Sequence, residues 1–145
     1  METTHRTVNL APRYGITIAV IAIIFSIIFN VTKTSGNLWT GYFGALLVFL
    51  GVLFAVIHYN SQHHEQTSML ALFGMGFRTT LWSVILFSMF SLVLHFLEPE
   101  SMNSSNFWIS LIGNVLFIPL ILGLLASIIA AMAFKSNQKT TRPGR

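Results

Sequence analysis

Residues 107–134 read FWISLIGNVLFIPLILGLLASIIAAMAF, a run of 28 positions without a charged side chain. Crossing a hydrocarbon layer about 30 Å thick takes roughly 20 apolar residues, because each residue advances a helix by about 1.5 Å. The run is therefore long enough to cross a membrane. Three further apolar stretches precede it, at residues 14–31, 38–59 and 79–97, and none of them contains an acidic residue or a lysine.

The composition points the same way, because 54% of the 145 residues are hydrophobic and only 8% are charged. Soluble proteins carry about 25% charged residues, so a soluble fold is excluded. The connections at 32–37 and 98–106 are too short to hold a domain, and neighbouring helices are expected to pack as antiparallel hairpins. The sequence predicts a single transmembrane domain over residues 1–145, with an all-α, integral membrane four-helix bundle fold and up-and-down hairpins.

Basic residues mark one side of this predicted bundle. The two tails and the second connection, residues 60–78, share that side and carry all the basic residues except Lys33. By the positive-inside rule this side is cytoplasmic, which places both termini inside the cell. Trp39 and Trp108 open helices at the opposite face and are predicted to be interfacial anchors. The basic residues on the cytoplasmic side are Arg6, Arg13, Arg78, Lys135, Lys139, Arg142 and Arg145.

Arg78 interrupts an apolar segment that covers residues 69–97. Starting the third span after Arg78 leaves 19 residues, about 28 Å of helix, and makes Arg78 an anchor at the inner interface. Residues 69–77 are then too short to span, and two alternatives stay open for them. They form an interfacial segment with a bend at Gly74 and Gly76, or they simply extend the third helix.

The middle of the chain resembles a known family. The similar residues are a polar turn at 60–68, Phe73-Gly74, and Phe77-Arg78 before a helix that ends at Leu97-Glu98-Pro99. Together they resemble the uncharacterised four-helix membrane family called domain of unknown function 4199, found mainly in Bacteroidota. The resemblance implies a bacterial inner membrane location and no particular activity. The central loop of that family commonly carries more charge, whereas this one has Glu65 and histidines.

Few polar side chains lie within the predicted spans. His95 lies near the end of the third predicted span, and it is read either as an interfacial histidine near the headgroups or as a proton-sensing or ligand group. Pro119 cannot donate to the carbonyl of Val115, so a kink is predicted there. Asn114 lies beside this position and is expected to point into the bundle, where it makes an interhelical hydrogen bond or lines a polar cavity or pore.

Catalytic and metal-binding constellations are not found in the sequence. There is no cysteine and no aspartate, and no glutamate or lysine lies within a predicted core, which disfavours proton-coupled transport. His58, His63, His64 and Glu65 include metal-ligand types, but their spacing does not match a helical zinc motif, and a solvated loop is the preferred interpretation. The sequence therefore predicts no metal, no cofactor and no enzymatic activity.

Small residues form stripes on two of the predicted helices and let helix backbones approach closely. Gly44 and Gly51 lie on the second predicted helix, and Gly123 begins a similar stripe on the fourth with Ser127 and Ala130. Whether these glycines serve packing within the chain or between chains stays open at this point.

Two classes of function remain. The first is a structural or accessory subunit that acts by helix contacts, either as a homo-oligomer or in a larger membrane complex. The second is an oligomeric passive pore or a small-ligand-binding membrane protein, with candidate lining residues Ser83, Ser88, Ser91, His95 and Asn114. The expected surroundings are a lipid bilayer, and the placement of the basic residues at membrane flanks argues against nucleic acid as a partner.

The orientation can be tested with alkaline phosphatase, which is active only outside the cytoplasm. A fusion after Asn103 is expected to be active and a fusion after Arg145 inactive, because seven of the eight basic residues favour the cytoplasmic side. Activity after Arg145 with none after Asn103 would reverse the assigned orientation.

Overall fold

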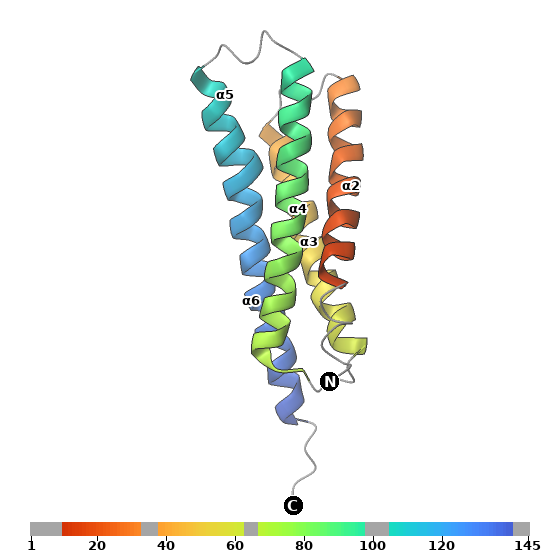
Figure 1. Ribbon diagram of the computed structural model, residues 1–145. Helices are drawn as coiled ribbons and strands as arrows, with labels where there is room; N and C mark the ends of the chain where they lie inside the picture. Colours follow the sequence, from red (N-terminus) through yellow and green to blue (C-terminus); the bar gives the residue numbers. More distant parts are fainter. Residues whose placement is uncertain (1–9, 33–37, 63–66, 98–104, 141–145) are drawn as a thin grey trace, which may run out of the picture.

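The computed structural model describes residues 10–32, 38–62, 67–97 and 105–140 (Figure 1). All of the elements in these ranges are helical, and four long rods lie side by side, which confirms the predicted all-α four-helix bundle. The fourth rod is made of three consecutive elements. In chain order the elements are α2 (Leu10–Val31), α3 (Leu38–Gln62), α4 (Met69–Leu97), α5 (Ser105–Ser110), the π-helix η2 (Leu111–Phe117) and α6 (Ile118–Thr140).

The helices are longer than the apolar runs that predict them. The first one starts at Leu10 and takes in Pro12, which a first helical turn tolerates because its backbone N–H groups have no partner within the helix. The second continues past Tyr59 to Gln62. Four of the helical segments are long and apolar enough to cross a membrane, so the chain is a multi-pass membrane protein.

The largest difference from the sequence-based prediction concerns residues 69–77. The alternative of a separate interfacial segment with a bend is wrong, because α4 runs without interruption from Met69 to Leu97. Leu72 is fully buried, and Gly76 is also buried because the Ser127 side chain of α6 packs directly against it. Glycine at this position thus provides room for a neighbouring helix and does not provide a bend.

The helices alternate in direction, so α2 and α4 run parallel to each other while α3 and the fourth rod run the opposite way (Figure 1). The most extensive contact is between the parallel helices α2 and α4, followed by α4 with α6 and α3 with α6. Hairpin connections predict contacts between consecutive helices, and they do not by themselves predict that α2 packs most extensively against α4. Helices α2 and α4 begin, and α3 and α6 finish, at the same end of the bundle. We call this the basic end, and we call the opposite one the far end.

Small residues bring α4 close to its neighbours at the basic end. A Cβ atom added at Gly15 of α2 would lie 2.5 Å from the Cβ of Trp82 and 3.0 Å from the carbonyl oxygen of Thr79. A Cβ at Gly123 of α6 would overlap the side chain of Thr80 in the same way. These glycines therefore set the distance between helix axes, as small residues do in membrane bundles.

Four hydroxyl groups are buried in the same region, and each of them is satisfied within its own helix. They donate to the backbone carbonyl four residues earlier, at 2.7 to 3.0 Å. Because no second helix is needed as an acceptor, the contacts between helices there are close packing of small groups. The buried hydroxyl residues are Thr79, Thr80, Ser83 and Ser127, all at 0% exposure.

The close packing at Gly15 can be tested against a matched control. Gly15→Ala is expected to destabilise the bundle by about 1–3 kcal/mol, the usual cost of overpacking, because the new methyl group meets backbone atoms that cannot rotate away. Gly74→Ala is the control, since a Cβ at Gly74 meets nothing within 4 Å and alanine favours helix. Unfolding in a titration with sodium dodecyl sulfate measures both variants, and equal stabilities would contradict the packing described here.

Candidate functional site

A cavity of about 370 Å³ lies between the helices in the half of the bundle nearer the far end. It is partly enclosed, and all four rods contribute to its walls. The last part of α2, the first part of α3, the last part of α4 and the η2 to α6 junction meet there. Residues 22–30, 43–48, 87–95 and 114–119 contain every lining residue.

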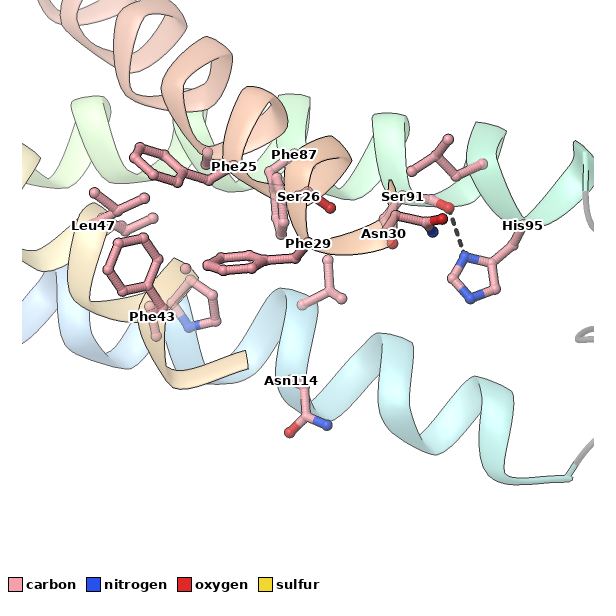
Figure 2. Close-up of a pocket in the computed structure, with 17 residues that line it drawn as sticks. Phe25, Ser26, Phe29, Asn30, Phe43, Leu47, Phe87, Ser91, His95 and Asn114 are labelled. Atoms are coloured by element: carbon pink, nitrogen blue, oxygen red, sulfur yellow. Dashed lines mark hydrogen bonds between the residues drawn. The ribbon is translucent and has the colours of Figure 1, made fainter. Parts of the chain in front are cut away.

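Phenylalanine side chains form the apolar wall of the cavity (Figure 2). The ring of Phe43 on α3 packs edge to face against Phe25 and Phe29 on α2, with centroids 5.2 and 5.6 Å away. Phe87 of α4 adds a fourth ring. Such edge contacts hold rings in defined orientations, so this wall is rigid and apolar. Gly44 and Ala45 are the small lining residues on α3, and a Cβ at Gly44 would meet nothing within 4 Å.

Most of the polar lining residues lie nearer the far end, whereas Ser26 lies among the phenylalanines. Asn30 is the last lining residue of α2 and His95 the last of α4, and Figure 2 shows both on the same side of the phenylalanines as Ser91. The Nδ1–H group of His95 donates to the carbonyl oxygen of Ser91 at 2.8 Å. His95 is half-buried among the lining residues, which is the position that the ligand-group interpretation requires.

Asn114 and Pro119 lie on the fourth side of the cavity, and one prediction about them is wrong. Asn114 borders the cavity but is exposed, and its amide points away from the other labelled residues in Figure 2, not into the bundle. The reason is the π-helix from Leu111 to Phe117, which changes the direction of each side chain relative to an α-helix. Pro119 is buried just after it. The backbone before the proline thus takes π geometry, one of the known adjustments around a proline in membranes.

The predicted packing glycines have different surroundings. Gly51 lies against Ile18 of α2, because an added Cβ would be 2.6 Å from the Cγ1 atom of that side chain. Gly123 lies against Thr80 of α4. Gly44 faces open space in the cavity and makes no close helix contact within the described part of the chain.

The remaining predicted residues lie away from the cavity. Arg78 and Trp108 are exposed, and Arg78 lies about 28 Å along α4 from Leu97, close to the hydrocarbon thickness of about 30 Å. Their role as interfacial anchors stays a prediction. Three predicted residues lie outside the described part of the chain, namely His63, His64 and Glu65. The side chain of Trp39 is also outside it. His58 is hydrogen-bonded to the hydroxyl of Tyr14. Among the described side chains, no group of three or more residues could hold a metal ion.

Sequence reasoning missed two groups of residues that matter here. Gly15 and Gly76 belong to small-residue contacts, and the spacing of Ala11, Gly15 and Ala19 four residues apart on α2 was a usable signal. The phenylalanine wall carries a weaker signal, because Phe25 and Phe29 are also four apart, but an apolar chain offers many such pairs. Comparisons with protein-family models, curated proteins and solved structures found no match to this chain.

The access of water to the cavity can be measured in a chain that has no native cysteine. Ser91→Cys lines the cavity and is expected to react at least several-fold faster with a charged methanethiosulfonate reagent than Val93→Cys. Val93 is the control because it lies two residues further along the same helix and is 56% exposed outside the cavity, where lipid would surround it. Equal rates for the two variants would show that the cavity is closed to water.

Proposed function

We propose that this chain is a multi-pass membrane protein that binds a small amphiphilic molecule in the cavity between its four helices. One observation carries the proposal: three of the five polar lining residues lie together toward the far end of the cavity. Phenylalanines form the deeper part, and Asn30, Ser91 and His95 lie toward the far end, where a bilayer becomes polar. A molecule with an apolar body and a hydrogen-bonding head matches this order.

The size and chemistry of the cavity support the same class of ligand. Its volume of about 370 Å³ is near the lower end of the range for small-molecule sites, roughly 300–1,000 Å³. Such sites combine apolar and aromatic walls with a few polar groups that orient the ligand. A molecule with one or two rings, or a short apolar chain, and an uncharged polar head meets these requirements, because none of the lining residues is an acid, a lysine or an arginine.

The other two functions have less support from the structure. The close packing of α4 against Gly15 and Gly123 at the basic end leaves no room for a pore through a single chain, so the predicted oligomeric pore would have to lie between chains. Ser83, a candidate pore residue, is fully buried and donates to the carbonyl oxygen of Thr79. A purely structural subunit needs no cavity, and filling the cavity would leave such a protein unaffected.

The proposed location is the bacterial inner membrane, with the cavity in the outer half of the bilayer. Two arguments from sequence support it: the resemblance to the four-helix family described above and the bias of basic residues toward the basic end. A homo-oligomer or a larger membrane complex is compatible with ligand binding within each chain.

A cavity-filling variant tests the proposal. Gly44→Leu places an apolar side chain where an added Cβ meets nothing within 4 Å, so it is expected to reduce the cavity without disturbing the helices. Gly74→Leu is the matched control, since Gly74 also faces open space but does not line the cavity. Each protein is purified in a mild detergent and analysed by native mass spectrometry for retained small molecules.

The wild-type chain and Gly74→Leu are expected to retain the same amphiphile, and Gly44→Leu is expected to lose at least nine-tenths of it. Retention by Gly44→Leu at the wild-type level would place the molecule elsewhere. If the wild-type chain retains nothing from its native membrane, the structural role is favoured instead.

A further inference from the structure

A second hollow lies on the outside of the bundle, between α2 and α3. It is a groove of about 670 Å³ with almost entirely apolar walls. Gly51 explains its floor, because the missing side chain lets Ile18 of α2 lie directly against α3. Leu50, Phe54 and Ile57 line the groove and are all more than two-fifths exposed. The groove therefore opens toward the surrounding lipid.

The groove has the length and direction of an acyl chain in one leaflet. Its lining on α3 extends from Leu47 to Ile57, a rise of ten residues or about 15 Å along the helix. This is half of a hydrocarbon layer about 30 Å thick. On α2 the lining begins at Tyr14, four residues from the start of that helix, so the groove belongs to the leaflet at the basic end.

A positive charge lies at the mouth of the groove. Arg13 is exposed and sits one helical turn before Thr17, a lining residue whose hydroxyl donates to the Arg13 carbonyl oxygen at 2.8 Å. Residues four apart share one face of a helix, and helical side chains lean toward the N-terminus, so the guanidinium extends from the groove toward the headgroups. A guanidinium can bind a phosphate through two parallel hydrogen bonds.

The two walls of the groove are joined at the same level. The Tyr14 hydroxyl of α2 is hydrogen-bonded to Nδ1 of His58 on α3, and the two rings meet edge to face with centroids 5.8 Å apart. Phe54, a lining residue one helical turn before His58, also stacks on the His58 ring. This contact fixes the spacing of α2 and α3 next to Arg13, so the mouth of the groove keeps its shape.

We infer that this groove binds an anionic phospholipid from the leaflet at the basic end, with one acyl chain along α2 and α3 and the phosphate on Arg13. The apolar walls select for an acyl chain, and Arg13 selects for an anionic headgroup over a zwitterionic one. The inference does not depend on the ligand proposed for the cavity, which shares only Leu47 with the lining of the groove.

The test uses the full chain in detergent micelles that contain equal amounts of phosphatidylglycerol and phosphatidylcholine. Native mass spectrometry measures which lipid the protein retains. The wild-type chain is expected to retain about fivefold more phosphatidylglycerol than phosphatidylcholine in its first bound lipid, the preference expected for one basic residue at a membrane surface. Arg13→Gln is expected to abolish this preference.

Arg78→Gln is the matched control, because Arg78 is also an exposed arginine but does not line or flank the groove. It is expected to keep the preference of the wild-type chain. Equal losses in the two variants would show a general effect of net charge and overturn the inference, as would a preference that survives Arg13→Gln. A dimer mass in place of a lipid adduct would identify a second copy of the chain as the occupant.

Discussion

The structure depends on close approach between α4 and its neighbours at the basic end. In a bilayer the lipid tails are as apolar as leucine side chains, so burial of apolar surface does not hold helices together as it does in water. Close packing must supply the attraction, and it is strongest where backbones meet. Gly15 of α2, Gly76 of α4 and Gly123 of α6 provide such meeting points. Thr80 and Ser127 fill the space opposite two of these glycines, and their own helices satisfy the hydroxyls.

The far half of the same helices is built from different residues and has different properties. Phe25, Phe29 and Phe43 hold one another by edge contacts, and the space beside them is not filled. A bundle of four helices can tolerate such a cavity because the basic half fixes the positions of the helix axes. The helices are thus held in close contact in the basic half and leave a cavity between them in the far half. The candidate site therefore lies beyond the close glycine contacts, and Gly44, which lines it, meets no neighbouring helix within 4 Å.

The number, type and approximate limits of the helices could be predicted, because about 20 apolar residues in a row have one stable arrangement in a bilayer. The site could be predicted only in part. His95 and Asn114 were candidates because polar groups are rare in apolar runs, but the outward direction of Asn114 depends on the π-helix, which no residue between 111 and 117 announces. The start of α4 could not be predicted from the sequence. A charged residue within an apolar run is typical of the end of a membrane span, but the helix itself continues through Arg78 to Met69.

The parallel contact between α2 and α4 has a consequence for biosynthesis. Gly15 and Ala19 of α2 are buried, and the most extensive contact of α2 is with α4. At Gly15 the contact partner is Trp82, which follows it by 67 residues in the chain. At a synthesis rate of about 5–20 residues per second, α2 waits roughly 3–13 s in the membrane before this partner is made. During that interval its small-residue face is open to any other helix that the insertion machinery holds nearby.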